Sequence, residues 1–402
     1  MLAVVTTPLP DADRPSRAAV APRIVRVLLA PFPRRLSADA AVLLAVVLFL
    51  VMFGLVMVLS ASSVDSRIDS GDSFTVFLRQ ASFAAVGVPL MVLAARMPAT
   101  LWARLSGPVL LVGCALQLLA LVTPLGVTVN GNRNWLELGP LTLQPSEIVK
   151  AGIVLWLAMF LAQRERRLGE MRGAVLPTLL VPGAAIGLVL LGGDLGTAMI
   201  LLAVVVGALY FAGVRMRHLL LVVGVIAVAV VIAAISRPSR LARIGAFLDP
   251  ASADPGDDGY QTLNGYYALS DGGVFGAGIG GSKEKWAWLP AVDTDFIFAI
   301  VGDDLGFIGA CTVLALLIVL AIVFARMTRG AQTMHQRVLT GAVMTWILGE
   351  SLVNIAVVLG LFPVLGVPLP FVSAGGTALL SALVMVGAVV SVSRPGRSSP
   401  VR

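Results

Sequence analysis

Long apolar runs separated by short polar connections restrict the fold of this chain more than any other feature. A bilayer core takes about 20 apolar residues per helix, and the 402 residues contain ten runs of about that length. With 58% hydrophobic and 13% charged residues, the chain carries more apolar surface than a soluble domain can bury. The sequence therefore predicts an all-α polytopic membrane protein of about ten transmembrane helices. The runs lie near residues 40–60, 74–95, 105–122, 147–162, 174–191, 195–213, 217–236, 295–325, 338–360 and 378–393.

Arginine and lysine set the predicted orientation of these helices. Most of the 29 basic residues lie in the N-terminal tail, or in connections that ten spans would place on the same side as both tails. Loops rich in these residues stay in the cytoplasm, so both termini are predicted to be cytoplasmic. The connections predicted to face outward are residues 61–73, 123–146, 237–294 and 361–377, of which the third is the longest.

The spans use most of the chain and leave no room for a separate soluble domain. We predict a basic tail at residues 1–38, rich in Pro, Ala and Arg and disordered, a ten-helix domain at 39–394 and a second tail at 395–402. The net charge of +7 comes from arginines spread over many loops. Such a spread does not favour nucleic acid, which needs a basic patch. Cys114 and Cys311 lie in apolar runs, which does not favour a disulfide framework.

A carboxylate stands where the longest outer connection meets the eighth apolar run. Asp295 occupies this junction, and Asp293 lies two residues earlier. A charge at the mouth of a membrane helix is costly to keep, which makes it a functional candidate. Aspartate before an apolar run is also a good helix N-cap. The sequence leaves both interpretations of Asp295 open.

The same connection carries a basic and a glycine-rich part. Arg240, Arg243 and Lys285 are basic residues on the outer side, where they can contact lipid headgroups or clamp a pyrophosphate. The run DGGVFGAGIGG at residues 271–281 formally matches GxGxxG. No strand and helix surround it, so a nucleotide site is not indicated. We expect these glycines to allow tight backbone turns over a substrate.

Several polar residues interrupt the other apolar runs. Glu147 and Lys150 are spaced i,i+3 at the start of the fourth run and are expected to pair on one helix face. Arg79 near the outer end of the second run can extend to the interface or face an inward cavity. Glu350 and Asn354 share one face of the ninth run. The prolines and glycines of residues 361–380 predict a broken helix that lines a cavity.

At this point a set of motifs carries a resemblance to a known family. The stretches QPSEIVK, DLGT, FLDP, GYQ, GGVFGAGIGG, KWAWLP, TDFIFAIVGDDLG and PLPFVSAGGTALL follow one another in this order. The chain resembles the FtsW/RodA/SpoVE family, the SEDS (shape, elongation, division and sporulation) peptidoglycan polymerases, over about residues 40–395. The amino-acid sequence of residues 267–290 is more similar to the division branch, FtsW, than to the elongation branch, RodA.

The resemblance implies a peptidoglycan glycosyltransferase that polymerises lipid II into glycan strands at the outer face of a bacterial cytoplasmic membrane during cell division. It also implies a class B penicillin-binding protein transpeptidase as partner, within a divisome or elongasome. A divalent cation, magnesium or manganese, is a family trait, and no organic cofactor is expected. The essential aspartate of the family falls on Asp295, and the paired Glu and Lys of its QPSExxK motif fall on Glu147 and Lys150.

The chemistry of such a reaction assigns roles to these residues. Transglycosylation needs a base that takes the proton of the acceptor hydroxyl, and Asp295 is assigned to it. The departing lipid pyrophosphate needs cationic groups or a metal. A continuous eighth helix would put Asp303 about 12 Å from Asp295, too far for a common metal shell. Candidate substrate contacts are Arg243, Arg240, Lys285, Glu147, Lys150, Arg79 and Ser373, and candidate cation ligands are Asp295 and Asp293.

The chain departs from the family pattern at several positions. Asp293 stands where the family has histidine, and its like charge would raise the pKa of one of the two carboxylates. Asn134 replaces an arginine, Glu350 a glutamine and Ala374 a tyrosine. Glutamates are usual where Asp303 and Asp304 stand. These departures leave room for a divergent paralogue.

Two other classes of function fit parts of the sequence. A lipid-linked precursor flippase or other transporter also has many spans, intramembrane charges and broken helices. However, no clear inverted repeat is visible, and the key carboxylate lies near the outer surface. A non-catalytic division scaffold is the third reading, and it requires Asp295 to be dispensable.

Overall fold

The computed structural model describes residues 36–129, 131–139, 141–249, 258–281 and 293–394. Nearly all of the two predicted tails, and Lys285, lie outside these residues. Nine helices of the described chain are long and apolar enough to cross a membrane, and a tenth, α13, is apolar but shorter. The polytopic helical fold predicted from the sequence is therefore confirmed.

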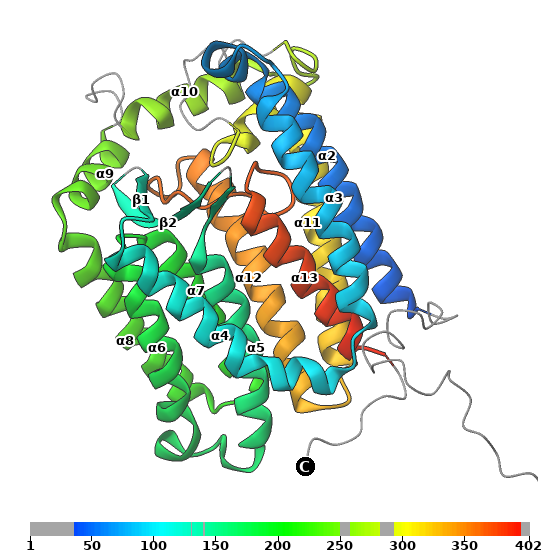
Figure 1. The fold of residues 1–402 in the computed structure, drawn as a ribbon, viewed down its shortest axis with the longest axis vertical. Helices are drawn as coiled ribbons and strands as arrows, with labels where there is room; N and C mark the ends of the chain where they lie inside the picture. Colours follow the sequence, from blue (N-terminus) through cyan, green and yellow to red (C-terminus); the bar gives the residue numbers. More distant parts are fainter. Residues whose placement is uncertain (1–35, 130, 140, 250–257, 282–292, 395–402) are drawn as a thin grey trace, which may run out of the picture. The chain divides into compact units, whose positions relative to one another are not determined.

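The helices follow the predicted apolar runs closely (Figure 1). The membrane helices are α2 (Ala38–Ser70), α3 (Thr75–Arg96), α4 (Ala99–Val122), α5 (Pro145–Gln163), α6 (Leu176–Leu191), α7 (Leu195–Ala212), α8 (Met216–Ile235), α11 (Ile297–Arg329), α12 (Met334–Val358) and α13 (Gly376–Val392). Shorter elements are η2 (Glu165–Arg167), η3 (Met171–Val175), which leads into α6, and two helices of the long outer connection, α9 (Pro238–Leu248) and α10 (Asp258–Asp271).

The first helix is longer than its apolar run. The connection predicted at residues 61–73 is mostly helical, because α2 continues to Ser70. The helix ends at Gly71, which takes a left-handed backbone with φ of 78° and donates its N–H to the carbonyl of Arg67. A glycine is the usual residue for such a C-terminal stop.

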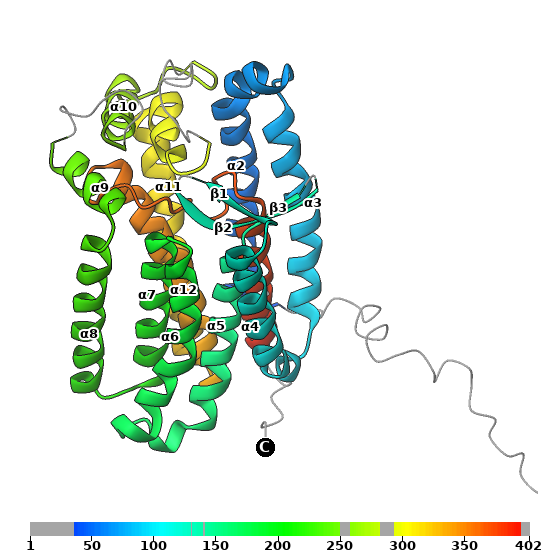
Figure 2. The same cartoon turned by 60° about the vertical axis from the view of Figure 1, so that its left-hand side comes forward.

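A small β-sheet, which the sequence analysis did not predict, fills the outer connection between α4 and α5. Its strands are β1 (Gly126–Val129), β2 (Asn132–Leu138) and β3 (Leu141–Leu143), paired antiparallel in the order β1-β2-β3. Gly131 and Gly139 have φ of 78° and 66° at the two tight turns. Positive φ is what short hairpin turns require, so glycine at these positions allows the strands to pair. Figure 2 shows the sheet close to α9 at one end of the helices.

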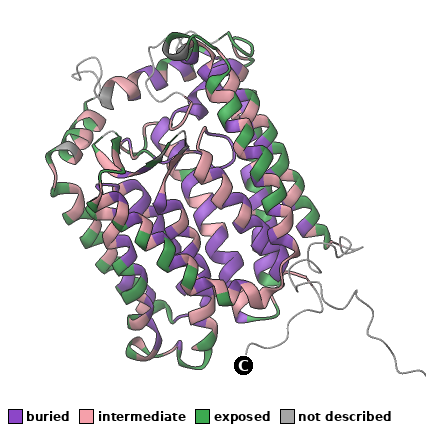
Figure 3. Ribbon diagram, viewed as in Figure 1, coloured by how far each residue is buried: buried purple, intermediate pink, exposed green. Residues whose placement is uncertain are grey.

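The most buried helices form the centre of the bundle. α12 packs against α5, α7, α11 and α13, while α3 packs against α13 and α4 against α5. Figure 3 shows the buried surface gathered on the central helices. By contrast, α8 buries only Leu219 and Val222 and leaves the rest of its apolar surface outward. A helix that is apolar all round and little buried by protein is suited to lipid contact.

The eighth membrane helix is not continuous. α11 is interrupted at Gly306, whose φ of 67° and ψ of −166° are far from helical values. The glycine-rich loop takes over the broken hydrogen bonds, since the N–H groups of Ala277 and Gly278 donate to the carbonyls of Asp303 and Asp304 at 2.9 and 3.0 Å. In return, the N–H of Phe307 donates to the carbonyl of Gly273 at 2.9 Å. These glycines therefore make the predicted tight backbone turns, and the loop that they form satisfies backbone groups at the break in α11.

Candidate functional site

A cavity of about 400 Å³ lies where the small sheet, α9, α10 and the connection before α13 meet the helix bundle. Its lining is mostly polar and comes from segments that are far apart in the sequence. Acidic side chains dominate the charged part of the wall, with one arginine among them. The charged lining residues are Glu147, Asp194, Arg243, Asp295 and Glu350.

Asp295 lines this cavity immediately before α11. The N-cap of α11 is Phe296, and no side chain caps the helix there. The N-cap interpretation of Asp295 is therefore wrong. Burial raises the pKa of Asp295 to about 7, and the negative charges of Asp293 and Asp194 act in the same direction. The positive charge of Arg243 opposes this shift. A carboxyl with a pKa near neutrality is suited to accept a proton in catalysis.

The backbone that carries Asp295 is fixed by a side chain of α12. Asn354 is buried, and its Nδ2 donates to the carbonyl oxygens of Asp295 and Val367, both at 2.8 Å. Val367 belongs to the connection between α12 and α13. One amide thus holds two walls of the cavity at a fixed separation.

Ser373 fixes the residue before Asp295. Its hydroxyl donates to the carbonyl of Thr294 at 2.5 Å and accepts the N–H of Leu369 at 2.8 Å. Gln80 of α3 holds Ser373 from the other side, because its Nε2 donates to the Ser373 carbonyl at 3.1 Å. Ser373 is buried and does not line the cavity. The substrate contact predicted for it is therefore not supported, and the side chain has a positioning role.

The connection between α12 and α13 has no regular helix, as its prolines and glycines predict. Residues 361–375 are irregular, and Phe371 has a φ of 67°, which is uncommon for a residue with a side chain. Val364, Gly366 and Pro368 line the cavity. The predicted broken helix at a cavity wall is therefore confirmed.

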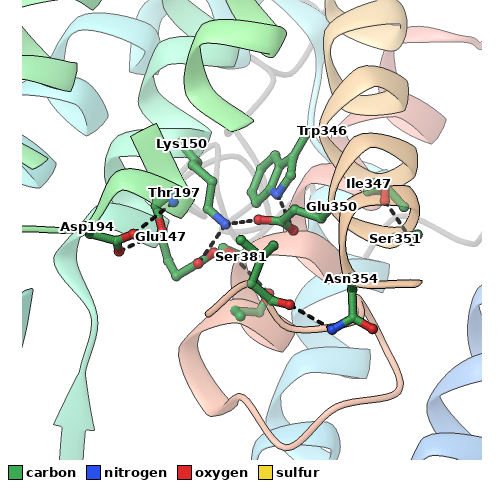
Figure 4. A network of polar contacts seen from close by, with 12 residues as sticks. Glu147, Lys150, Asp194, Thr197, Trp346, Ile347, Glu350, Ser351, Asn354 and Ser381 are labelled. Atoms are coloured by element: carbon green, nitrogen blue, oxygen red, sulfur yellow. Dashed lines mark hydrogen bonds and ion pairs between the residues drawn. The ribbon is translucent and has the colours of Figure 1, made fainter. Parts of the chain in front are cut away.

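A cluster of buried charges, called the charged floor below, contributes Glu147 and Glu350 to the cavity wall, and Figure 4 shows its contacts. Lys150 pairs with Glu147 at 2.7 Å, as its spacing predicts, and it also pairs with Glu350 of α12. Trp346 Nε1 donates to Glu350 Oε2 at 2.8 Å, and the Ser381 hydroxyl donates to Glu147 Oε2 at 2.9 Å. Every carboxylate oxygen of the cluster has a partner. Glu147 and Glu350 line the cavity, whereas Lys150 lies behind them.

Comparison with known proteins identifies the family. The sequence matches the family model FtsW/RodA/SpoVE, described as "Cell cycle protein", over residues 40–398. The chain belongs to the FtsW/RodA/SpoVE family. It is 35% identical over 379 residues to the probable peptidoglycan glycosyltransferase FtsW of Trichlorobacter lovleyi, covering 94% of this chain and 98% of that protein.

Two further comparisons extend this relationship. The chain is 34% identical to stage V sporulation protein E of Bacillus subtilis, covering 88% of this chain and 97% of that protein. A solved structure that concerns "structural coordination of polymerization and crosslinking by a peptidoglycan synthase complex" contains a chain with the same fold. The TM-score is 0.69 and the identity 28%, covering 87% of this chain and 96% of that chain.

The basic residues predicted to contact substrate are not all at the cavity of this FtsW/RodA/SpoVE protein. Arg243 lines it together with Asp295. Arg240 lines a neighbouring cavity of about 240 Å³ and donates to the carbonyls of Ala233 and Gly193 at 2.6 and 3.0 Å. Arg79 is exposed, donates to the hydroxyl of Thr142 in β3 and does not line the cavity. Lys285 lies outside the described residues.

The cavity also contains functional candidates that the sequence analysis did not select. Asp194 caps α7, where it accepts the N–H of Thr197 at 2.8 Å and the hydroxyl of Thr197 at 2.7 Å, and it lines the cavity. Burial raises the pKa of Asp194 above its usual value. Asn134 and Gln261 are neutral members of the wall. The DLGT motif was a usable signal for Asp194, and the GYQ motif was one for Gln261.

The residues predicted to hold a cation do not share one wall. Asp295 lines the cavity, but Asp293 is not among its lining residues. Within the described part of the chain, no group of three or more His, Cys, Asp or Glu side chains is placed to hold a metal ion. Magnesium is often held by one or two carboxylates together with substrate phosphates. These residues do not make a protein-only metal site.

Proposed function

We propose that this chain is a peptidoglycan glycosyltransferase that polymerises lipid II at the outer face of the cytoplasmic membrane of a bacterium. The observation that carries the proposal is Asp295, a carboxyl with a pKa of about 7 that shares one cavity with Arg243 at the mouth of a membrane helix. The FtsW relatives, named as probable peptidoglycan glycosyltransferases, support the same reaction class. The lysine and arginine distribution, which predicts this mouth on the outer side, supports the proposal.

Asp295 would act as the general base. Its ionised carboxylate accepts the proton of a sugar hydroxyl on the acceptor. The hydroxyl oxygen then forms a bond to the anomeric carbon of the donor sugar. The bond between that carbon and the pyrophosphate oxygen breaks, and the lipid pyrophosphate leaves with the electron pair. A glycosidic bond replaces the phosphoester, and the proton remains on Asp295 until solvent removes it.

Arg243 would stabilise the departing pyrophosphate. Its guanidinium provides several donors for phosphate oxygens, and it lines both the cavity of Asp295 and the neighbouring apolar cavity. A leaving group held at this boundary can keep its lipid on the apolar side. A magnesium or manganese ion would supply further positive charge there. The step assigned to Asp295 does not depend on that ion.

The division branch and its partners form a further part of the proposal. Several of the similar relatives are named FtsW. The solved synthase complex concerns the coordination of polymerisation with crosslinking. We therefore expect a class B penicillin-binding protein transpeptidase and other divisome proteins as partners of this chain.

Polymerisation of labelled lipid II by the purified protein tests this function, alone and with candidate transpeptidases. We expect glycan strands from the wild type and none from Asp295→Ala or Asp295→Asn, with thermal unfolding showing that each variant is folded. Equal polymer from wild type and variants would overturn the assignment of Asp295. If no partner yields polymer from the wild type, the proposed function is wrong, and lipid scrambling becomes the activity to measure. Chelation of divalent cations in the same assay tests whether polymerisation requires magnesium or manganese.

A further inference from the structure

An apolar groove between α7 and α8 lies away from the floor of the Asp295 cavity. Its volume is about 550 Å³, and Thr345 of α12 contributes to its base. α8 supplies Leu219, Val223, Ile226 and Val230, whose spacing puts them on one helix face. Because α8 packs mainly against its neighbours in sequence, α7 and α9, no other helix of the described residues fills this face.

The groove is about as long as one leaflet of a bilayer. Leu219 and Val230 are eleven residues apart on α8, and Met199 and Tyr210 have the same separation on α7. At 1.5 Å per residue this is about 16 Å. The hydrocarbon core of a bilayer is about 30 Å thick. One acyl chain of a lipid therefore fits the length of the groove.

The groove face of α8 continues to an exposed arginine. Arg215 is the N-cap of α8 and precedes Leu219 by four residues, so both are on the same face. Its guanidinium lies against the connection between α5 and α6, because a Cβ at Gly169 would be 3.1–3.3 Å from guanidinium atoms. A glycine at position 169 leaves room for this approach. A cation thus lies one helical turn before Leu219, the first α8 residue that lines the groove.

The start of α8 and the connection that Arg215 contacts carry four other arginines. The described chain contains no ion pair that engages any of them, although Glu165 and Glu170 belong to the same connection. All are exposed. They are Arg166, Arg167, Arg172 and Arg217. This end of the molecule is therefore positively charged and open to anionic groups.

The arginines lie at the edge of the lipid-facing surface. Met216, Leu220 and Leu221 follow Arg215 on α8 and are 57%, 63% and 56% exposed. Such side chains face hydrocarbon in a membrane helix. Arg215 is therefore at the level of the lipid headgroups, on the side that the distribution of basic residues predicts to be cytoplasmic.

We propose that the α7–α8 groove binds an anionic phospholipid of the cytoplasmic leaflet, with its phosphate on Arg215 and one acyl chain along Leu219 to Val230. The charge of the groove end and the length of the groove together select this occupant. The proposal is independent of the glycosyltransferase reaction, because it concerns the opposite end of the molecule from Asp295.

A second lipid could enter the same groove from the other end. Met199 and Val230 also line the neighbouring cavity that contains Arg237, Arg240 and Arg243. The tail of an outer-leaflet lipid pyrophosphate could extend from there into the groove. In that case the headgroup would contact Arg237 and its neighbours, and Arg215 would make no difference to binding. The experiment separates these two sources of phosphate.

The test uses full-length, delipidated protein in detergent, loaded with phosphatidylglycerol or with phosphatidylcholine of the same acyl chains. Bound phospholipid per chain is measured by mass spectrometry after gel filtration. We expect Arg215→Gln to weaken phosphatidylglycerol binding about fivefold, since one arginine near a charged headgroup contributes about 1 kcal/mol. Phosphatidylcholine binding stays unchanged. Arg104→Gln is the matched control, because Arg104 is exposed in the second turn of α4 and does not line the groove.

A groove-filling variant tests the acyl chain. Ala203 is exposed on α7 and lines the groove, so Ala203→Phe is expected to reduce binding of both phospholipids. Val223→Phe is the second such variant, and thermal unfolding checks that each variant is folded. Equal losses in Arg215→Gln and Arg104→Gln would overturn the proposal in favour of general surface charge. It is also overturned if long-chain polyprenyl pyrophosphate fills the groove and its binding depends on Arg237 but not on Arg215.

Discussion

The Asn354 amide donates a 2.8 Å hydrogen bond to the backbone carbonyl of Asp295. The same Nδ2 donates a hydrogen bond to the carbonyl of Val367, in the connection between α12 and α13. Asn354 is one helical turn beyond Glu350 on α12, so a single helix presents both the charged floor and the support of the carboxylate. The position of Asp295 is therefore set by α12, as well as by its own helix.

Asn354→Leu is expected to displace Asp295 while the carboxylate itself is retained. Loss of both hydrogen bonds should lower kcat about 100-fold, the effect of a misplacement of about 1 Å, and leave KM nearly unchanged. Steady-state kinetics with lipid II measures the two constants. Ser351→Ala is the matched control on the same helix, because Ser351 only bonds its own helix at Ile347. An unchanged kcat in Asn354→Leu would show that this amide has no positioning role.

The pKa of Asp295 predicts the pH dependence of activity. The base must be ionised, so kcat/KM should rise as pH increases through about 7. Arg243→Gln removes the charge that lowers this pKa, and the rising limb should move to higher pH. Arg79→Gln is the control, since Arg79 is exposed outside the cavity. If kcat/KM rises at the same pH in the wild type and in Arg243→Gln, the assignment of this rise to Asp295 is contradicted.

The same pKa predicts how stability depends on pH. The folded-state pKa of Asp295 is raised from 3.8 to about 7, so the unfolded chain releases this proton first. The contribution of Asp295 to stability is full below about pH 4 and is lost as pH rises to about 7. Asp295→Asn should therefore unfold at a higher temperature than wild type at pH 8, with little difference at pH 4. Thermal unfolding in detergent measures the difference in unfolding temperature between Asp295→Asn and the wild type. A larger difference at pH 4 than at pH 8 would contradict the raised pKa of Asp295.

Lys150→Met should be among the most destabilising substitutions in the protein. It leaves Glu147 and Glu350 buried without a cation, and breaking a buried pair costs about 3–5 kcal/mol. Removal of both carboxylates in addition, by Glu147→Gln and Glu350→Gln, should restore most of the loss. Thermal unfolding compares the single and triple variants. A triple variant as unstable as Lys150→Met would mean that the lysine acts through packing and not through charge.

Gly306→Ala should destabilise the fold through the break in α11. A side chain is strained at its φ of 67°, and its Cβ would collide with Gly276 and Val274. We expect a loss of at least about 1–3 kcal/mol from the backbone strain alone. Gly349→Ala in α12 is the matched control, because a Cβ there has nothing within 4 Å. It should be neutral or gain about 0.5–1 kcal/mol, and equal behaviour of the two variants in thermal unfolding would contradict this account.

The helices could be predicted from the sequence because lipid imposes one simple requirement on each of them, an apolar run of sufficient length. Local pairs were also predictable, as Glu147 and Lys150 show. The second partner of Lys150 was not, because Glu350 is 200 residues away. Ser373 was assigned to substrate because a motif does not reveal the direction of a side chain. The sheet had a local signal in the sequence, the dipeptide Asn130-Gly131, which the analysis of apolar runs did not use.

The charged floor has a consequence for the order in which the chain is made and inserted. Glu147 and Lys150 are synthesised together and can enter the bilayer as a neutral pair within one turn of α5. Glu350 emerges 200 residues after Lys150, on a helix that offers it only the indole N–H of Trp346. Its carboxyl stays poorly solvated until α12 docks on α5, which makes any other arrangement of α12 unfavourable. We therefore expect the contact between Glu350 and Lys150 to favour the native arrangement of α12 late in the assembly of the bundle.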